Sequence, residues 1–356
     1  MDTTRADSSQ DAFLVRVHTD EGIVGLGEAD SSPYLLRAAV EMPSSHAVAC
    51  GLRELLLGED PLQIGRLWSR LYRGSSYYGR AGVALHAMAA IDMALWDIAG
   101  QAAGRPISDL LGGARVREIP VYASEVMPET AAEVRAIAER AVAAGYGALK
   151  LGWGPLGRDP ATDEALIRAA RETIGPDRDL MIDGGQVYSV PQATRLLRRV
   201  EDVDLYWFEE PFAPDDYESY RRLAGAVPVK IAAGEADAAI GPFRDLVERG
   251  HVSVLQPDMA RTGFTTARQI ADLARERRVE VVPHCFSTGV LVAASLHFAS
   301  TLERPTYTEF SVADSPLASG LLAEPFALAG GKLAVPTGPG LGIALDEGLV
   351  ARLRAD

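Results

Sequence analysis

Short apolar runs alternate with amphipathic stretches from about residue 118 to the last part of the chain. The runs are PVYAS, GALKLGW, DLMIDGG, LYWFEEP, VKIAAGE, VSVLQPD, VEVVPHC and TYTEFS. Between them lie segments in which apolar residues recur at helical spacing, such as TAAEVRAIAERAVAAG and TARQIADLARERR. This alternation predicts parallel βα units, whose strands must be covered on both faces. Eight such strands predict an α/β barrel.

The first part of the chain has a different pattern. FLVRVHTD (13–20) and EGIVGLGEAD (21–30) alternate apolar and polar residues around a Glu-Gly turn, which predicts a β-hairpin. From about residue 33 to 112 the apolar spacing becomes helical, and the segment GVALHAMAAIDMALWDIAGQAAG ends in glycine, as helices often do. We therefore expect an N-terminal α+β domain over residues 1–117, followed by the barrel.

Ionisable residues close six successive apolar runs, at intervals of 26, 26, 23, 26 and 25 residues. They are Asp183, Glu209, Glu235, Asp258, His284 and Glu309. One βα unit takes about this many residues, so the spacing predicts one ionisable group at the same end of each successive strand. The carboxyl ends of barrel strands form the catalytic face of such folds. Any one of these residues could simply begin a loop or cap a helix, but six in step are poorly explained in that way.

The stretch YWFEEPF (206–212) places two glutamates side by side. Side chains alternate along a strand, so only one of Glu209 and Glu210 can face the barrel mouth. Glu209 would then converge with Asp183 and Glu235, and three carboxylates repel one another unless a cation holds them together. Ligation by oxygen alone suits Mg²⁺ better than Zn²⁺. We expect the other glutamate to contact a base or a neighbouring loop.

Composition narrows the class of protein. The chain has 356 residues, of which 35 are basic and 49 acidic, for a net charge of -14. This charge argues against a nucleic acid or an anionic membrane surface as partner. Two cysteines, Cys50 and Cys285, provide no disulfide framework, and the start MDTTRADSSQ lacks the pattern of a signal peptide. With no apolar run of 18 or more residues, we expect a soluble cytoplasmic protein.

Several motifs together resemble the enolase superfamily, mandelate racemase subgroup, over roughly residues 13–345. They are VRVHTDEGIVGLGEAD, AIDMALWDIAGQ, LLGG, ALKLGWG, MIDGGQ, WFEEP, AAGE, QPDMARTGF, VPHCFSTG and EFSVADSPL. The resemblance implies a modified (β/α)7β barrel over residues 118–318, under an α+β capping domain. It implies that residues 319–356 return to the cap. Relatives are often symmetric oligomers, so we expect a homo-oligomer.

The resemblance also implies roles for the ionisable residues. Asp183, Glu209 and Glu235 would bind Mg²⁺, Asp258 and His284 would form a catalytic dyad, and Glu309 would hydrogen-bond the substrate carboxylate or the enolate oxygen. A divalent cation offsets the negative charge that develops when a proton is removed next to a carboxylate. His284 begins near a suitable pKa for a base, and Asp258 would fix its tautomer.

The chain departs from the family pattern at the second barrel strand. Many relatives carry Lys-x-Lys there; in this chain Lys150 matches the first lysine and Gly152 stands in place of the second. Lys150 would then neutralise substrate charge, and two-base racemisation becomes doubtful. The start is short by comparison, which suggests that the first strand and a covering loop are missing or reduced. Tyr34, Tyr77 and Arg261 remain as candidates for substrate contact. Arg261 could instead sit behind Asp258, and each of the three could be an ordinary surface or loop residue.

The sequence therefore favours an enzyme that uses Mg²⁺ to dehydrate an acid sugar, an aldonate or aldarate, to a 2-keto-3-deoxy acid. His284 would remove the α-proton before the β-hydroxyl leaves. A racemase, an epimerase or a lactone cycloisomerase would share the first step and stays an alternative. A sugar-acid-binding barrel without catalysis is a further alternative, but it would require damage to the ligands or the dyad, and the sequence shows none.

Overall fold

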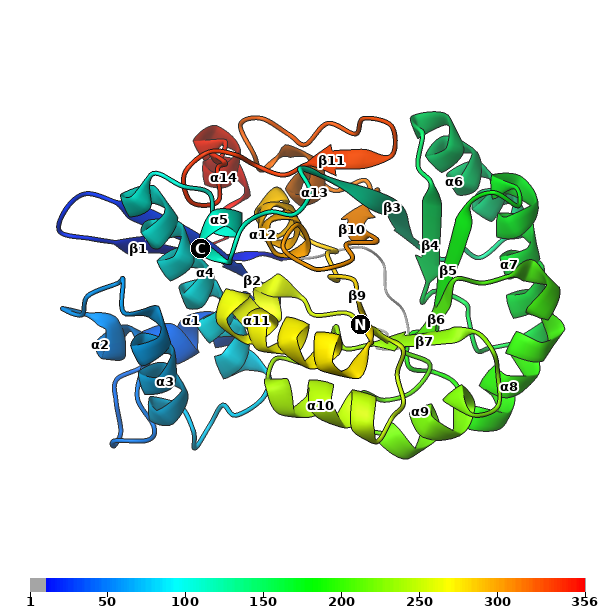
Figure 1. The fold of residues 1–356 in the computed structure, drawn as a ribbon, viewed down its shortest axis with the longest axis horizontal. Helices are drawn as coiled ribbons and strands as arrows, with labels where there is room; N and C mark the ends of the chain where they lie inside the picture. The colour runs from blue at the N-terminus through cyan, green and yellow to red at the C-terminus, as the bar shows by residue number, and fades with distance from the viewer. Residues whose placement is uncertain (1–10, 356) are drawn as a thin grey trace.

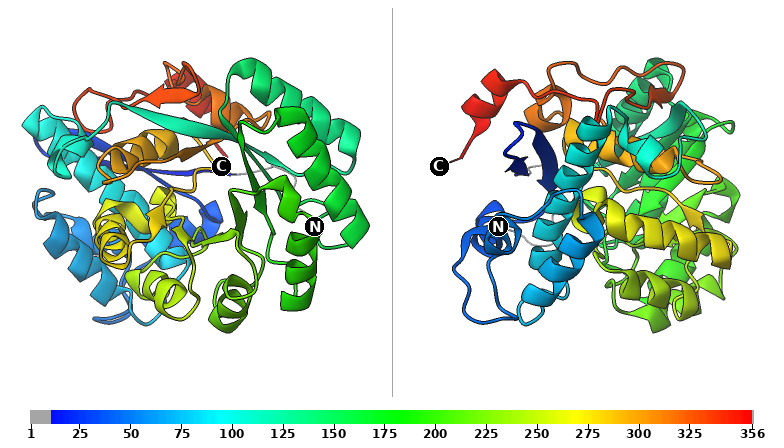
Figure 2. Two further views of the ribbon diagram at one scale, coloured as in Figure 1. Left: turned by 45° about the vertical axis from the view of Figure 1, so that its right-hand side comes forward. Right: turned by 60° about the vertical axis from the view of Figure 1, so that its left-hand side comes forward.

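The computed structural model of the protein describes residues 11–355. The expected reduction of the first strand and covering loop falls chiefly on residues 1–10, outside the described residues. The chain forms a strand–helix barrel with an α+β layer beside it, and the last residues pass back across both (Figures 1 and 2).

The N-terminal layer is a hairpin backed by helices. Strands β1 (Phe13–His18) and β2 (Val24–Ala29) pair antiparallel, as the sequence predicts. Five helices follow: α1 (Pro33–Glu41), α2 (Leu52–Leu56), α3 (Ile64–Gly74), α4 (Val83–Ala103) and α5 (Ile107–Leu110). Helix α4 packs directly on β2 because two strand residues lack a side chain. A Cβ on Gly25 or Gly27 would lie 2.1 or 1.9 Å from carbonyl oxygens of α4.

Helix α4 is long and apolar enough to cross a membrane, but 83% of its apolar window is buried inside the protein. It is the central helix of the N-terminal layer, with β2 on one side and α11 (Met259–Arg277) against it as well. Its apolar character therefore serves packing on several sides, and it is not a membrane span.

Eight parallel neighbours form the barrel sheet, in the spatial order β10-β3-β4-β5-β6-β7-β8-β9. They are β3 (Glu118–Val126), β4 (Ala148–Gly152), β5 (Asp179–Asp183), β6 (Trp207–Glu209), β7 (Lys230–Ala233), β8 (Val254–Leu255), β9 (Glu280–Val281) and β10 (Thr308–Ser311). All eight predicted strands are present. Between the outermost two, the Glu309 amide donates to the Pro283 carbonyl at 3.4 Å.

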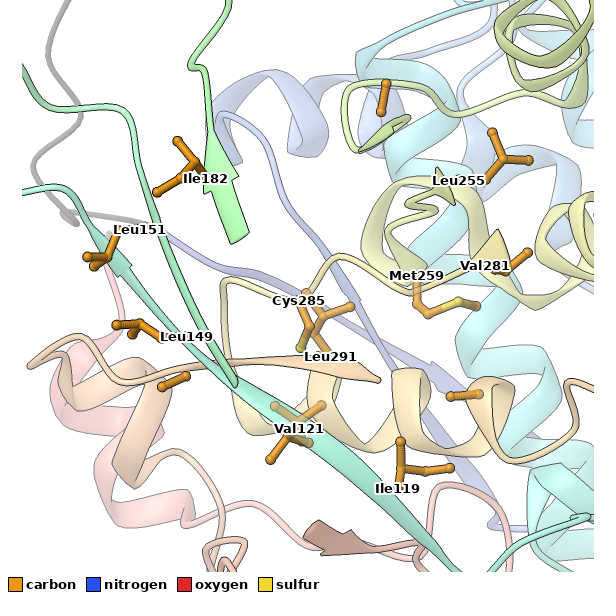
Figure 3. Packing of buried hydrophobic residues seen from close by; sticks show 14 of the residues in the cluster. Ile119, Val121, Leu149, Leu151, Ile182, Leu255, Met259, Val281, Cys285 and Leu291 are labelled. Carbon is orange, nitrogen blue, oxygen red and sulfur yellow. The ribbon is translucent and has the colours of Figure 1, made fainter. Parts of the chain in front are cut away.

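Helices cover the outer face of the sheet, one after each of the strands β3 to β9. They are α6 (Ala131–Ala144), α7 (Pro160–Ile174), α8 (Val190–Arg199), α9 (Tyr217–Ala224), α10 (Ile240–Glu248), α11 and α12 (Gly289–Ala299), with a short 3-10 turn η1 (Glu201–Val203). The main core lies between strands and helices, and it includes Val121, Leu149 and Ile182 of the strands and Leu291 of α12 (Figure 3). A smaller cluster fills the barrel interior: Tyr122, Ala148, Met181, Trp207, Ala232, Val254 and Val282.

The chain after the barrel contacts both parts of the molecule. Helix α13 (Pro316–Gly320) is followed by strand β11 (Lys332–Ala334), which pairs antiparallel with β3. The Leu341 amide then donates to Asp97 of α4 at 2.8 Å, and Glu347 of α14 (Glu347–Leu353) pairs with Arg16 of β1 at 2.7 Å.

Candidate active site

Three carboxylates meet at the carboxyl ends of neighbouring strands. Asp183 is the last residue of β5, Glu209 is the last of β6, and Glu235 follows β7 by two residues. All three are buried, and one oxygen of each lies within 4.8 Å of the others. The strand register pairs Asp183 with Glu209 directly. The spacing in the sequence thus predicted a real convergence.

The electrostatics of this triad call for a cation. Burial, followed by repulsion from Glu209, raises the pKa of Asp183 well above its usual range. Burial likewise raises the pKa of Glu209 to about 7, although Lys150 opposes the shift. Buried carboxylates of this kind are costly unless paired, and hard divalent ions prefer carboxylate oxygens as ligands. The donor set therefore fits a cation such as Mg²⁺.

The second glutamate of the FEEP stretch has a different role, as strand alternation predicts. Trp207 lies inside the barrel with Glu209, and Glu210 turns away from them into the loops. Its carboxylate accepts hydrogen bonds from the Gln186 side chain at 2.6 Å and from the Gly234 amide at 3.3 Å. Burial raises the pKa of Glu210 to about 8. Glu210 therefore links the loop that follows Asp183 to the backbone just before Glu235.

Asp258 and His284 form a hydrogen-bonded pair just beyond the carboxyl ends of the next two strands, β8 and β9. Asp258 is the N-cap of α11, where its Oδ1 accepts from the Ala260 amide at 2.6 Å. Its Oδ2 lies 2.7 Å from Nδ1 of His284. This contact favours a proton on Nδ1, so Nε2 is the ring nitrogen that can receive a proton from elsewhere. Nε2 faces Glu235 at 3.4 Å and Glu309 at 3.7 Å.

The charges around His284 stabilise its protonated form. Burial favours the neutral ring, but the carboxylates of Glu235, Glu309 and Asp258 together raise the pKa of His284 to about 10. A cation held by Glu235 would oppose this shift by compensating one of those charges. The ring can thus hold a proton firmly beside the triad.

Lys150 and Glu309 lie next to the carboxylate triad and complete the buried cluster of ionisable side chains. The Lys150 ammonium lies 2.6 Å from Glu209 and 2.9 Å from Glu309. Although burial disfavours the charge, these two carboxylates raise the pKa of Lys150 well above its usual range. Against burial, the cations of Lys150 and His284 lower the pKa of Glu309 to about 2, and its Oε2 also accepts from the Cys285 amide at 2.9 Å.

Gly152, two positions after Lys150 on the strand, has no room for a second lysine. A Cβ built on Gly152 would lie 2.2 Å from Cβ of Asp183 and 2.9 Å from its carboxyl carbon. Any side chain there would displace a member of the triad. The absence of the second basic residue is therefore built into the packing at the ends of β4 and β5.

The three candidate substrate contacts lie in different surroundings. Tyr34 on α1 and Tyr77 after α3 are 72% and 76% exposed, and within residues 11–355 neither makes a hydrogen bond to the cluster. Tyr77 instead packs its ring against His46, with centroids 5.3 Å apart. Arg261 lies behind the dyad, where it donates to the Glu235 carbonyl at 2.5 Å and to Asp30 at 2.7 Å.

Two acids near this cluster, the buried Glu28 and the partly buried Asp30, escaped the sequence analysis. Glu28 on β2 accepts hydrogen bonds from Ser287 and Thr288, both at 2.6 Å, and Asp30 pairs with Arg261. The signal was the GEAD stretch, in which a carboxylate closes an apolar strand just as in the barrel. The hairpin pattern alone gave no indication of which surface that strand would meet.

Comparison with known proteins agrees with this geometry. Residues 3–112 match the N-terminal domain of mandelate racemase and muconate lactonizing enzyme, and residues 133–349 match the enolase C-terminal domain-like family. The chain is 33% identical over 355 residues to D-galactarolactone cycloisomerase of Agrobacterium fabrum, covering 96% of this chain and 90% of the relative. It is 34% identical over 353 residues to D-galactonate dehydratase of Ralstonia nicotianae, covering 95% and 90%.

Solved structures show the same fold. A 3,6-anhydro-D-galactonate cycloisomerase from Zobellia galactanivorans superposes with a TM-score of 0.89 at 31% identity, covering 96% of this chain and 94% of the other. A racemase from Streptomyces coelicolor with bound magnesium gives 0.87 at 30% identity, covering 100% and 96%. With both domains matched along most of its length, the chain belongs to the mandelate racemase/muconate lactonizing enzyme family of enolase-superfamily enzymes.

Proposed function

We propose that the protein is a Mg²⁺-dependent acid-sugar dehydratase, which converts an aldonate or aldarate to a 2-keto-3-deoxy acid. The observation that carries this proposal is the single base. His284 stands beside the triad, while Lys150 is bound to two carboxylates and Gly152 leaves no place for a second base. Named relatives include dehydratases of D-galactonate, L-rhamnonate and arabinonate.

Each residue of the site has a separate role in the proposed reaction. Nε2 of His284 takes the proton from the carbon next to the substrate carboxylate, and Asp258 holds the ring in the required tautomer. Bound Mg²⁺ would supply a Lewis acid that offsets the negative charge on the substrate oxygens. Asp183, Glu209 and Glu235 would hold it, and the Lys150 ammonium would add a fixed positive charge beside them.

The elimination step needs no further co-reactant. The electron pair of the broken C–H bond forms the double bond to the neighbouring carbon as the β-hydroxyl departs. Protonated His284 returns its proton to that oxygen, so the leaving group is water. The resulting enol then becomes the 2-keto acid by tautomerisation.

A cycloisomerase of acid-sugar lactones is the second candidate function. Two of the relatives are cycloisomerases, of D-galactarolactone and of 3,6-anhydro-alpha-L-galactonate. Such a reaction also begins with one base beside a carboxylate-bound cation, so His284 would keep its place in it. The intact dyad and triad within residues 11–355 argue against a sugar-acid-binding barrel without catalysis.

Three further points belong to the same proposal. We take residues 1–117 as the cap, 118–318 as the barrel and 319–356 as a segment returning to the cap. We also take the protein to be a cytoplasmic homo-oligomer, with no nucleic acid or membrane as partner. Sedimentation at micromolar concentration tests the oligomer, since a single 38 kDa species would rule it out.

A substrate panel tests the reaction itself. Aldonates, aldarates and their lactones are incubated with the enzyme and Mg²⁺, and 2-keto acids are detected with semicarbazide while proton NMR follows lactone isomers. We expect a 2-keto-3-deoxy acid from at least one aldonate or aldarate, and no product in EDTA. Conversion of lactones alone would favour the cycloisomerase, and product formation that persists in EDTA would contradict the role of the cation.

A further inference from the structure

The end of strand β2 carries two acids that face the barrel. Glu28 lies on β2, and Asp30 is the residue just after the strand ends at Ala29. Glu28 accepts from Ser287 and Thr288 at 2.6 Å each and from the Leu291 amide at 3.0 Å. The Asp30 carboxylate binds Nη2 of Arg261 at 2.7 Å.

The barrel groups that these acids bind follow the two dyad residues directly in the sequence. Ser287 and Thr288 come three and four residues after His284, and Arg261 comes three residues after Asp258. The end of β2 and the residue after it therefore bind both chain segments that leave the dyad. The two segments follow neighbouring strands of the barrel, β8 and β9, and the capping layer contacts each of them separately.

Arg261 connects the contacts made by Asp30 to the catalytic groups. Its Nη1 donates to the Glu235 carbonyl at 2.5 Å, and its Nε lies 3.9 Å from Oδ2 of Asp258. That oxygen is the one that binds Nδ1 of His284. A shift of Arg261 would therefore move the backbone of Glu235 and change the field at the oxygen that orients the base.

Because these polar contacts are buried, we expect them to do more than attach the capping domain to the barrel. Glu28 is fully buried, and burial raises its pKa to about 7 despite the hydrogen bonds that it accepts from Ser287, Thr288 and Leu291. Well-packed apolar residues would join two domains at lower cost than buried ionisable groups do. Directional hydrogen bonds, by contrast, fix the positions of the groups they join.

We propose that Glu28 and Asp30 are positioning residues, through which the capping domain sets the geometry of the Asp258–His284 pair. Glu28 holds the segment after His284, and Asp30 holds Arg261 behind Asp258. The proposal rests on the proposed function, in which His284 is the base. Neither acid touches the reacting atoms; each acts through the segment that it binds.

The chain offers a matched control for a purely structural role. Asp92 of α4 also joins the cap to the barrel, since its Oδ2 accepts from the Thr265 amide at 2.9 Å. It binds α11 beyond the kink at Gly263 and contacts neither dyad residue by any hydrogen bond within the described chain. Asp92→Asn therefore loosens the cap without reaching the segments next to the dyad.

The test observes the hydrogen bond between Asp258 and His284 by NMR, and it needs no substrate. The full-length protein is labelled with ¹⁵N-histidine, and the low-field proton on Nδ1 of His284 is assigned by its loss in His284→Asn. We expect Asp30→Asn and Glu28→Gln to shift or broaden this resonance, while Asp92→Asn lowers the melting temperature and leaves the resonance in place. An unchanged resonance in both Asp30→Asn and Glu28→Gln would overturn the proposal, as would an equal change in Asp92→Asn.

Kinetics on a substrate from the panel give the second readout. Replacing an outer partner of a catalytic group costs about 10- to 100-fold in activity. We expect this loss in kcat for Asp30→Asn and Glu28→Gln, with KM changed much less, and partial recovery in Arg261→Lys compared with Arg261→Met. A loss confined to KM would contradict positioning. If no substrate is found, the proposed function fails, while the resonance test of Glu28 and Asp30 still stands.

Discussion

The ammonium of Lys150 lies 2.6 Å from the carboxylate of Glu209, a member of the predicted metal triad. The lysine is buried and bound on its other side to Glu309 at 2.9 Å. Because these carboxylates hold its pKa well above the usual range, Lys150 keeps its proton at neutral pH. It is therefore suited to stabilise negative charge, and in the proposed function His284 takes the proton.

The first prediction separates these two roles by hydrogen exchange in D₂O. His284→Asn should lose α-hydrogen exchange and product together, because general base catalysis contributes about 100- to 10,000-fold and no second base remains. Lys150→Met should slow turnover by a similar order as the loss of one electrostatic donor, about 100- to 1,000-fold. Its remaining exchange should still depend on His284, as the double variant would show.

The opposite pattern would reverse the assignment. If His284→Asn continued to exchange the α-hydrogen while Lys150→Met did not, Lys150 would be the base. Both variants are followed by mass spectrometry of recovered substrate, which detects one deuterium per molecule. Near-ultraviolet circular dichroism confirms that each variant is folded.

Local sequence patterns predicted the barrel and most of the cluster. The spacing of six ionisable residues at the ends of apolar runs was enough to predict that Asp183, Glu209 and Glu235 converge. The prediction succeeded because successive βα units have similar lengths and their strands are neighbours in the barrel. Alternation along one strand also separated the buried partner Glu210 from Glu209. These predictions succeeded because they depend on neighbours in sequence or in a regular sheet.

Contacts between the two layers could not be predicted in this way. Asp30 and Arg261 are 231 residues apart, and Glu28 and Ser287 are 259 apart. No periodic pattern relates a hairpin to the far side of a barrel, so the partner of Arg261 stayed open between substrate and protein. The crowding at Gly152 was likewise invisible, since it depends on how closely β4 and β5 approach at their ends.

The second prediction concerns magnesium and stability. Asp183→Asn removes one of three mutually repelling buried carboxylates, so the variant without metal should melt at a higher temperature than the wild-type protein. Added Mg²⁺ should raise the melting temperature of the wild-type protein, because a ligand that binds only the folded state stabilises it. The variant should respond far less. Differential scanning fluorimetry in EDTA and in millimolar Mg²⁺ measures both effects.

Two comparisons make this test decisive. Asp177→Asn, at an exposed turn before β5, removes an acid of the same type and should leave the magnesium response intact. An Asp183→Asn protein that gains as much stability from Mg²⁺ as the wild-type protein would exclude Asp183 as a ligand.

The third prediction concerns Gly152. The added methyl of Gly152→Ala would overlap Asp183, whose Cβ lies 2.2 Å from the position it would occupy. We expect the variant to fold, because only the end of β4 must move, but to bind Mg²⁺ at least about tenfold more weakly. Isothermal titration calorimetry measures the affinity. Gly147→Ala, at the other end of the strand where the added Cβ meets no atom within 4 Å, is the control. Unchanged affinity in Gly152→Ala would show that the strand ends can separate freely.

The last prediction concerns Asp237, in the loop between β7 and α10. Its Oδ2 is buried without a hydrogen-bond partner, and burial, with repulsion from Asp215 and Asp245, raises its pKa from 3.8 to about 7. The folded protein therefore binds this proton more tightly than the unfolded chain does. As pH rises from about 4 to about 7, the free energy of unfolding should fall, by at most about 1.4 kcal/mol per pH unit from this group.

Asp237→Asn removes this dependence, since the amide does not titrate. Urea unfolding at pH 5, 6, 7 and 8 should show the variant gaining stability relative to the wild-type protein as pH rises, with the difference levelling above about pH 7. Other titrating groups act on both proteins and largely cancel in the difference. Asp177→Asn again serves as the exposed control and should give a flat difference. A gap between Asp237→Asn and wild type that stays constant over this range would mean that Asp237 is charged throughout, and that the loop opens enough to solvate it.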